Sequence, residues 1–304
     1  MIGHIFYWVI NMSLVASLIG LPVLLIRCAR FLPGRFLAFL WIPPFLHMIL
    51  PIGIGTKFSF LSILSRFFTR TVVVEQPMDF IELSSTNVLS QASCYSPMAF
   101  PTERTENFFQ FGGIIWLIVS VLLIIVITCI YHASFWQLRN ANHLYGIFYE
   151  SDRVSSPAVY GILRPRIVFP VGYAKEYREF VIDHEWMHIK RRDNLWRLLA
   201  VYLLAVHWFN PFCYLMFYLM TADTEVACDE SVIMRYNNQD RLSYAKALVY
   251  GAEQNTAFFS PFFGAGVKNR IYRILNYREM TVFGTVCSCA FFFVLILFLM
   301  GYAK

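Results

Sequence analysis

Hydrophobic residues dominate four long stretches of the chain, and each stretch predicts a helix that can cross a membrane. The stretches are 5–27, 36–54, 111–131 and 282–301. As a helix, about 20 consecutive apolar residues span the hydrocarbon core of a bilayer. Pro43, Pro44 and Pro51 interrupt the second stretch, which nevertheless has no Asp, Glu, Lys or Arg. The pattern predicts a mainly α-helical integral membrane protein with four transmembrane helices.

Basic residues between the predicted spans indicate which loops face the cytoplasm. Arg27, Arg30 and Arg35 crowd the short connection between the first two spans, which places it in the cytoplasm and the N-terminus outside. The first span lacks the basic start of a cleavable signal peptide, so we expect it to be retained in a multi-pass protein of the cell membrane. The expected segments are two spanning helices within 1–54, an extracytoplasmic loop at 55–110, a third helix at 111–131, a cytoplasmic domain at 132–281, and a fourth helix with a short external tail at 282–304.

The composition supports a membrane protein. Hydrophobic residues make up 58% of the chain and charged residues 14%, whereas soluble domains have about 25% charged residues. We interpret the net charge of +6 as cytoplasmic loop bias, so the lipid bilayer is an expected partner and direct nucleic-acid binding is not. The seven cysteines include no Cys-x-x-Cys pair, which argues against a disulfide scaffold or a thiolate metal site.

The segment 181–188 of the cytoplasmic domain has a metal-binding pattern. His184, Glu185 and His188 form a His-Glu-x-x-His motif. Residues four apart lie on one face of a helix, so both imidazoles can bind the same zinc ion. Glu185 lies beside them, where it can take a proton from water. The alternative is a solvated or core helix that contains two histidines by chance, because five-residue motifs recur.

An apolar stretch at 195–220 separates this motif from the residues that could supply the third ligand of a zinc hydrolase. If the stretch crossed the membrane once, the motif and the candidates for the third ligand would lie on opposite sides of the membrane. However, Asn210 and Pro211 interrupt it, and a proline usually ends a helix. We therefore predict a broken helical hairpin, re-entrant or lying against the membrane. The candidate ligands that it would return to the motif, or hold within the hairpin, are His207, Asp223, Glu225, Asp229 and Glu230.

Glu225 and Asp229 have the spacing of residues on one helical face. This spacing allows Glu225 to bind the metal while Asp229 orients a liganding histidine, as carboxylates behind metal ligands commonly do. The alternative is a solvated acidic helix. We favour the metal ligand because the two histidines require a further partner.

The start of the cytoplasmic domain predicts β-structure. Short β-rich runs between residues 155 and 170 are separated by glycine and proline, which is typical of a hairpin or edge strands. A helical pattern begins near Glu176 and continues through the motif. The domain at 132–281 is therefore predicted to be α+β, and the Val159 to Phe169 region is a candidate edge strand for docking an extended peptide.

Several motifs, taken in order, resemble a known family. They are His184-Glu185-x-x-His188, Arg191-Arg192-Asp193-Asn194, Trp208-Phe209-Asn210-Pro211, Glu225-Val226-Ala227-Cys228-Asp229-Glu230, and the stretch from Gly264 to Asn276. This set resembles the BlaR/MecR-type integral membrane zinc metallopeptidases, the beta-lactam antirepressor peptidases.

The resemblance implies a gluzincin-like domain in which His184, His188 and Glu225 bind zinc and Glu185 is the catalytic base. Sensor–transducers of this type continue after the last span into an extracellular penicillin-binding domain. The present sequence ends at Lys304. We therefore expect a sensorless member that lacks this domain.

The predicted function is a membrane-embedded zinc endopeptidase that cleaves a cytoplasmic protein, such as a transcriptional repressor, or itself during signalling. The alternative is a non-enzymatic signalling scaffold with a structural metal site. Structural zinc usually has four protein ligands, often cysteines, and the sequence indicates no further well-placed Cys or His. A transporter is disfavoured because the spans lack internal charges. A homodimer is a further candidate assembly.

Overall fold

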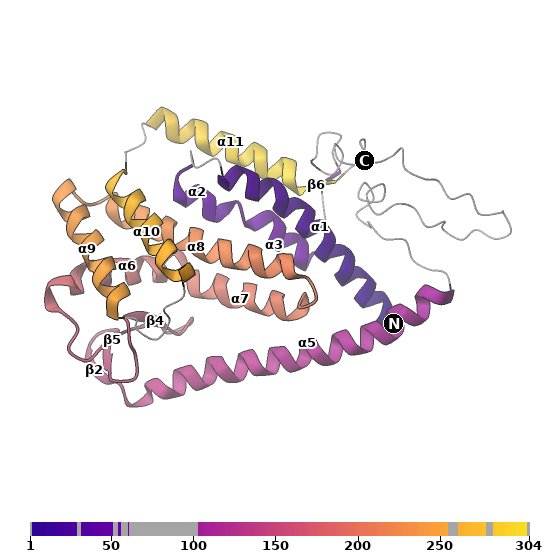
Figure 1. Ribbon diagram of the computed structural model, residues 1–304, viewed down its shortest axis with the longest axis horizontal. Helices are drawn as coiled ribbons and strands as arrows, with labels where there is room; N and C mark the ends of the chain where they lie inside the picture. The colour runs from indigo at the N-terminus through magenta and orange to yellow at the C-terminus, as the bar shows by residue number, and fades with distance from the viewer. Residues whose placement is uncertain are drawn as a thin grey trace.

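The computed structural model describes residues 2–28, 32–50, 54–55, 60, 103–254, 261–277 and 282–302. The described chain is mostly helical with a small mixed sheet, as the sequence predicts (Figure 1). Most of the predicted extracytoplasmic loop at 55–110 lies outside the described residues.

Two described helices are long and apolar enough, by length and composition, to cross a membrane. They are α1 (Ile2–Cys28) and the Asn107–Asn140 part of the chain, most of which is α5 (Glu103–Gln137). The first includes the span predicted at 5–27, and the second includes the span predicted at 111–131. The apolar helix α11 (Val282–Met300) has 19 residues and matches the position of the fourth predicted span.

The second predicted span, 36–54, does not form one continuous helix. It contains two short helices, α2 (Gly34–Phe39) and α3 (Ile42–Ile49), and then the short strand β1 (Ile54–Gly55), which pairs with β6 (Gly301–Tyr302). The break has a local cause. Pro43 and Pro44 lie in the first turn of α3, where their missing N–H groups cost little, so a new helix begins there.

The apolar stretch at 195–220 forms a helical hairpin of α7 (Asp193–Val206) and α8 (Pro211–Ile233). Asn210 ends the turn because its side chain accepts a hydrogen bond from the Phe212 N–H at 3.0 Å, and Pro211 begins α8. The Asn210 amide also donates to the Ser13 and Ser17 hydroxyls of α1 at 2.7 and 2.8 Å. The tip of the hairpin therefore contacts the middle of α1.

A four-stranded sheet has the order β2-β3-β5-β4. Its strands are β2 (Asn142–Tyr145), β3 (Phe148–Ser151), β4 (Ala158–Tyr160) and β5 (Arg166–Pro170), and the turn η2 (Leu138–Asn140) connects it to α5. β3 and β5 run parallel, and the other pairs are antiparallel. The edge-strand interpretation of Val159 to Phe169 is thus correct for β4 and wrong for β5, which is enclosed by strands on both sides and is buried at Ile167 to Phe169.

Helix α6 (Lys175–Arg191) contains the His-Glu-x-x-His motif and ends because Arg192 adopts the left-handed conformation, with φ of 56°. The Arg192 N–H bonds the carbonyl of Ile189 and closes this end of the helix. The left-handed residue turns the chain sharply, so that Asp193 begins α7 beside the last turn of α6.

A glycine at position 192 should stabilise the protein, because a non-glycine residue in this conformation costs about 1–2 kcal/mol. The extra chain entropy of glycine offsets about half of that gain, so we expect Arg192→Gly to increase the free energy of unfolding by about 0.5–1 kcal/mol. Lys190→Gly, inside α6, should decrease it by about 1 kcal/mol. The thermal unfolding midpoints of the two variants test this, and a lower midpoint for Arg192→Gly would contradict it.

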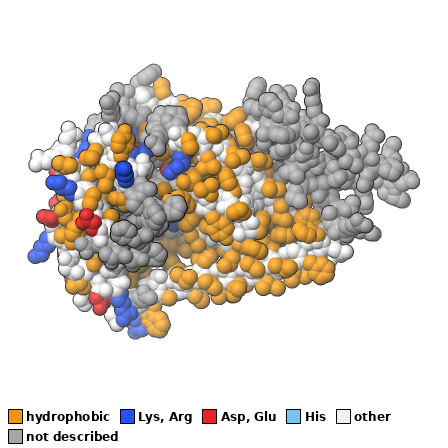
Figure 2. All heavy atoms as spheres, viewed as in Figure 1, with side chains coloured by type: hydrophobic (Ala, Val, Ile, Leu, Met, Phe, Trp, Pro, Cys, Tyr) orange, Lys and Arg blue, Asp and Glu red, His pale blue; other side chains and the backbone are white. Residues whose placement is uncertain are grey.

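Helix α9 (Asn238–Gln254) packs on α6, α10 (Pro261–Leu275) packs on α8, and α9 and α10 pack on each other. A buried cluster holds the four helices together. It contains Met187, Cys228, Val232, Ile233, Tyr244, Ala245 and Ile274. In the space-filling view, acidic and basic side chains gather at the end that holds α6, α9 and the sheet, while hydrophobic side chains cover the adjoining face over α7 and α8 (Figure 2).

Helix α8 also packs closely against the connection between α1 and α2. Asp223 is buried and accepts hydrogen bonds from Arg27 Nε at 2.9 Å and from the Trp41 indole at 2.9 Å. Glu230 accepts from the Gly34 N–H at 2.6 Å. A side chain at Gly34 would place its Cβ 2.5 Å from Val226, so this glycine permits the close approach of α2 to α8.

Candidate metal centre

The motif histidines face each other on α6. The Nε2 atoms of His184 and His188 are 3.1 Å apart, and both side chains are buried. Their separation follows from the helix, since residues four apart stack on one face. The two ring nitrogens that point at each other need a cation or a proton between them.

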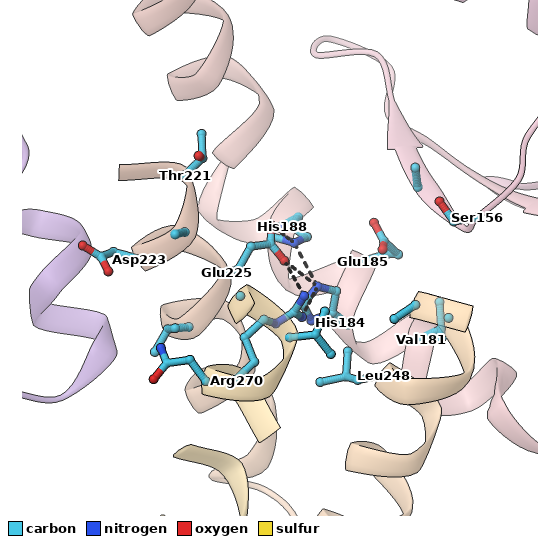
Figure 3. Close-up of a pocket in the computed structure, with 18 of the residues that line it drawn as sticks. Ser156, Val181, His184, Glu185, His188, Thr221, Asp223, Glu225, Leu248 and Arg270 are labelled. Carbon is cyan, nitrogen blue, oxygen red and sulfur yellow. Dashed lines mark hydrogen bonds and ion pairs between the residues drawn. The ribbon is translucent and has the colours of Figure 1, made fainter. Parts of the chain in front are cut away.

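The α7–α8 hairpin brings Glu225 to this pair. Its Oε2 lies 3.4 Å from His184 Nε2, and its Oε1 lies 3.5 Å from His188 Nε2 (Figure 3). Zinc bonds of about 2.0–2.1 Å at tetrahedral angles place neighbouring ligand atoms roughly 3.3–3.4 Å apart. The separations are close to this value, so the two imidazoles and the Glu225 carboxylate can bind one metal ion, and a tetrahedral ion would keep one further position open.

Hydrogen bonds at the opposite ring nitrogens orient both imidazoles for metal binding. His188 Nδ1 lies 2.6 Å from Asp193 Oδ2 and donates its proton to that carboxylate. His184 Nδ1 lies 2.8 Å from the Tyr244 hydroxyl, which donates its only proton to Asp229 Oδ1 at 2.7 Å. His184 Nδ1 must therefore be the donor to Tyr244. In both rings this makes Nε2 the atom that can bind a metal, although Arg270 Nη2 lies 3.4 Å from His184 Nε2.

Two guanidinium groups hold Glu225 in its ionised form. Arg197 pairs with Oε1, and Arg270 Nη1 lies 3.2 Å from Oε2. Burial alone would raise the pKa of Glu225, but Arg270 and then the histidines lower it well below the usual value. Arg270 also binds Asp229 at 2.7 and 2.8 Å and lowers its pKa to about 2 against the effect of burial. Both carboxylates are thus anionic, as metal ligands and their supports must be.

The imidazoles bind protons tightly when no metal competes. Burial lowers the pKa of His188, but hydrogen bonds with Asp193 and Cys228 outweigh it and give a pKa of about 9. The pKa of His184 is also raised, because Cys228, Tyr244 and Asp229 outweigh burial. Metal binding must therefore displace protons from these rings, so metal affinity will increase with pH.

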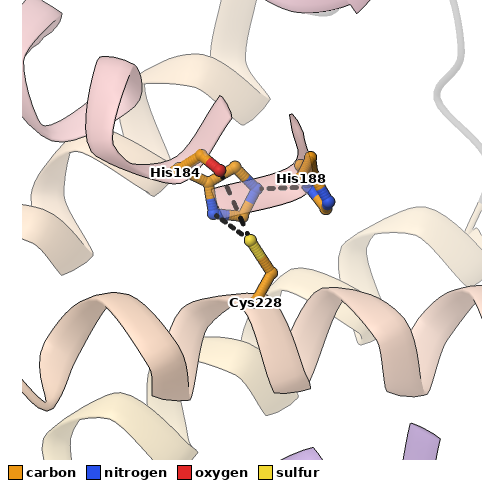
Figure 4. A group of neighbouring side chains, drawn as sticks. All are labelled: His184, His188 and Cys228. Carbon is orange, nitrogen blue, oxygen red and sulfur yellow. Dashed lines mark hydrogen bonds between the residues drawn. The ribbon is translucent and has the colours of Figure 1, made fainter. Parts of the chain in front are cut away.

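Cys228 offers a second possible ligand. His184, His188 and Cys228 place one ligand atom each within 4.8 Å of the others (Figure 4). The expectation that no further cysteine or histidine is well placed was wrong for Cys228. Its sulfur, however, lies 3.6 Å from Nδ1 of His184, the nitrogen that already contacts Tyr244. We favour Glu225 because its oxygens lie against the Nε2 atoms of both histidines.

Glu185 lines a cavity of about 1130 Å³ beside the metal centre. Figure 3 shows it on the side of the histidines that faces Ser156, whereas Glu225 and Arg270 lie on the other side. Burial raises the pKa of the Glu185 carboxyl, and the two imidazoles oppose this shift. A carboxylate with a raised pKa is a stronger base near neutral pH, so Glu185 is suited to accept a proton in this cavity.

Tyr173 lines the same cavity and follows the end of β5. Its side chain is only 4% exposed, and its hydroxyl has no hydrogen-bond partner among the described residues. Burial, Tyr250 and Glu185 raise its pKa to about 12, so the hydroxyl keeps its proton. A buried hydroxyl without a partner is costly, which points to a ligand that accepts its hydrogen bond.

The structure brings together His184, His188, Glu225, Asp229 and the half-buried Glu185. The other candidates lie elsewhere: Asp223 and Glu230 face the α1–α2 connection, and His207 lies in the hairpin turn. Sequence reasoning missed the residues that support the ligands, which are Asp193, Arg197, Tyr244 and Arg270. Asp193 and Arg270 lie in stretches that contribute to the family resemblance, but the sequence assigned neither of them a role.

Comparison with known proteins gives the family of the chain. A family model described as BlaR1 peptidase M56 matches residues 7–271. The methicillin resistance mecR1 protein of Staphylococcus aureus is 28% identical over 141 residues, and regulatory protein BlaR1 of Bacillus licheniformis is 26% identical over 142 residues. Each match covers 43% of this chain and 24% of the relative, so the aligned part is about a quarter of the relatives' length. The family match covers most of the chain, which therefore belongs to the BlaR1 peptidase M56 family.

Proposed function

We propose that this protein is a membrane-embedded zinc endopeptidase that cleaves a cytoplasmic protein in regulated proteolysis. The observation that supports it best is the approach of Glu225 to the two motif histidines. Their Nε2 atoms are 3.1 Å apart, and the Glu225 oxygens Oε2 and Oε1 lie 3.4 Å from His184 Nε2 and 3.5 Å from His188 Nε2, respectively. The donor set of two imidazoles and one carboxylate is that of catalytic zinc, which keeps an open position. Membership of a peptidase family supports the same conclusion.

When bound, zinc supplies Lewis acidity that polarises a carbonyl group and acidifies a water molecule. Glu185 accepts the proton of the attacking water and later donates it to the nitrogen of the leaving amine. Tyr173 donates a hydrogen bond to the carbonyl oxygen as negative charge develops on it. Asp193 and the Tyr244–Asp229 pair keep the two imidazoles in the orientation that the ligands need.

Strand β4 is the proposed docking edge for the substrate. Ala158 and Val159 line the catalytic cavity, and β4 has β5 on one side only. An extended peptide can add to such an edge by backbone hydrogen bonds, with its scissile bond beside the metal. The Asn194 side-chain amide already donates a hydrogen bond to the Val159 carbonyl at 2.9 Å, and this limits the length of the edge that a peptide can use.

The proposed orientation places the N-terminus outside, four spans in the bilayer and the 132–281 domain in the cytoplasm. Ion pairing of Arg27 with Asp223 supports it, because the basic connection after α1 lies on the same side as the catalytic residues. The hairpin of α7 and α8 is proposed to be re-entrant. Its turn is anchored to α1 by Asn210 and to α5 by the Trp116 indole, which donates to the Val206 carbonyl at 2.7 Å. Irregular backbone at membrane depth requires such internal partners.

The proposed substrates are a cytoplasmic repressor and the protease itself. The name of the Bacillus licheniformis relative describes a regulatory protein, which favours proteolysis in signalling. The test is a survey of new protein N-termini in cytoplasmic extract incubated with the purified full chain in nanodiscs. A chelator should abolish the cleavage and added zinc should restore it. Cleavage that persists after the metal has been removed would refute the proposal.

Replacing Tyr173 with phenylalanine tests its role. We expect kcat to fall by about 100-fold with little change in KM, since the hydrogen bond forms mainly in the transition state. Zinc content and thermal stability should not decrease, because the hydroxyl has no partner among the described residues. Tyr177→Phe is the matched control on α6. If Tyr173→Phe kept the kcat of the wild type, Tyr173 would not be the donor to the carbonyl oxygen, and another group would have to supply this hydrogen bond.

The second candidate function is a signalling scaffold with a structural metal site, which the position of Cys228 favours. Replacing Cys228 with serine separates the two. The endopeptidase should retain stoichiometric zinc and most of its activity, because Cys228 contacts the side of His184 away from the metal. A structural site that uses this thiolate should lose zinc and unfold at a lower temperature. Metal analysis and thermal unfolding of the purified variant decide between them.

A further inference from the structure

A second cavity, of about 770 Å³, lies where α5 meets the sheet. Its lining combines one basic group from β5 with basic, aromatic and apolar side chains at the end of α5. The lining residues are Cys129, His132, Ala133, Phe135, Trp136, Arg139 and Arg166. The metal centre shares none of these residues.

The arginines of this cavity lack acidic partners in the described part of the chain. Among the described residues, no carboxylate lies within ion-pair distance of Arg139 or Arg166. Arg166 instead stacks on the rings of Phe135 and Tyr149, at 5.2 and 5.0 Å from their centroids. The aromatic rings fix its guanidinium group and leave its hydrogen-bond donors available to an anion.

The turn between β4 and β5 extends the same surface. Gly161 has φ of +87°, and a Cβ there would lie 3.5 Å from Phe135, so the turn passes directly beside the end of α5. Leu163 at the turn is 95% exposed, and Trp136 is 72% exposed. Two exposed large apolar side chains, flanked by the basic Arg139, are typical of a surface that enters the interface of a membrane.

The end of α5 that lines this cavity lies at the level of the lipid headgroups. The predicted span ends at residue 131, and Arg139 follows by eight residues, or about 12 Å at a helical rise. The polar layer on each side of a bilayer is roughly 5–7 Å thick, so His132 to Trp136 lie across it and the Arg139 backbone lies about 5 Å beyond its outer border, a distance that a long arginine side chain can span. Trp at this level and unpaired Arg beyond it are the expected partners of lipid phosphates.

We propose that this cavity binds the headgroup of an anionic phospholipid of the cytoplasmic leaflet, with Arg139 and Arg166 on the phosphate and the exposed Trp136 and Leu163 in the interfacial layer beside it. The inference rests on the proposed membrane placement of α5. The turn at 161–165 continues directly from β4, the edge strand of the catalytic cavity. A bound lipid would therefore fix the docking strand relative to the membrane surface.

The experiment is native mass spectrometry of the full chain in detergent, titrated with phosphatidylglycerol or phosphatidylcholine. The wild type should bind phosphatidylglycerol more tightly. Each arginine near an anionic lipid contributes about a fivefold factor, so Arg139→Gln combined with Arg166→Gln should weaken phosphatidylglycerol binding by roughly 25-fold. The control is Arg235→Gln, at an exposed arginine after α8, which should leave binding unchanged.

Arg166 also stacks in the fold, so Arg139→Gln alone is the second variant and should cost about fivefold with no change in unfolding temperature. Equal binding of the two lipids, or unchanged binding in both variants, would overturn the proposal. Displacement of the lipid by equimolar inorganic phosphate would show an anion site without lipid specificity and would also overturn it.

Membrane placement is measured separately, by whether the chain stays in the membrane pellet after an alkaline carbonate wash. Release of the wild type from the pellet would refute the placement on which the inference rests. Retention in the pellet with equal binding of the two lipids would refute the lipid site alone and leave the proposed protease function intact.

Discussion

Glu185→Gln should abolish proteolysis while the protein keeps its metal and its fold. The carboxylate lines the catalytic cavity beside the histidines, and burial raises its pKa toward the range in which it can both accept and return a proton. A glutamine has the same size but cannot carry the proton. General acid–base catalysis contributes about 10²–10⁴-fold, and we expect kcat to fall by at least the lower figure.

The measurement is the cleavage rate of any substrate, including the chain itself, together with zinc per chain. Glu179→Gln is the matched control, because Glu179 is an exposed glutamate on the same helix. It should cleave at the wild-type rate. A Glu185→Gln protein that cleaves normally would exclude the proposed general base, and one that lost zinc would show that Glu185 acts on the metal instead.

Glu225→Ala should release the metal. In the proposed site Glu225 is the third ligand, and even residues behind the ligands change metal affinity by about 10–100-fold, so loss of a direct ligand should reduce it by more than about 100-fold. The carboxylate also neutralises Arg197 and Arg270, so its removal leaves buried positive charge and should lower the unfolding temperature.

A second variant separates these effects. Glu225→Gln retains the size and some hydrogen bonds of the side chain but loses its charge, and it should lose zinc with less destabilisation. Zinc titration and thermal unfolding measure both, with Glu253→Gln on α9 as an exposed control. If both Glu225 variants kept stoichiometric zinc, the third ligand would be a different group, and Cys228 would become the first candidate.

The sequence contained enough information to place the two histidines of the proposed metal site side by side. Helical spacing alone put His184 and His188 on one face, and the Asn210–Pro211 break indicated a hairpin. The structure has that hairpin and brings Glu225 to the histidines. These features could be predicted because they depend on local geometry, namely four-residue spacing and a proline that ends a helix. The predicted resemblance to BlaR/MecR-type peptidases is confirmed by the family match.

The supporting residues depend on how separate helices pack, which spacing does not encode. Tyr244 and Arg270 reach the site from α9 and α10, and their register is set by the buried cluster around Ile233 and Ile274. The turn at Arg192 was equally inaccessible, because arginine rarely adopts the left-handed conformation that brings Asp193 back to His188. Cys228 was misjudged because its neighbours in the sequence are charged, although its position in space is buried.

The proposed metal centre requires that α8 be held at a closely defined rotation about its own axis. Asp223 and Glu230 are seven residues apart and lie on one face, bonded to Arg27 and to Gly34, while Glu225 faces the opposite way (Figure 3). With side chains reaching about 6 Å from the helix axis, a rotation of α8 by 20° would move the Glu225 carboxylate by roughly 2 Å. Metal–ligand distances tolerate only about 0.2 Å, or roughly 2° of rotation. The contacts of α8 with α1 and α2 fix the rotation of α8 about its axis. They lie on the side of α8 opposite to Glu225.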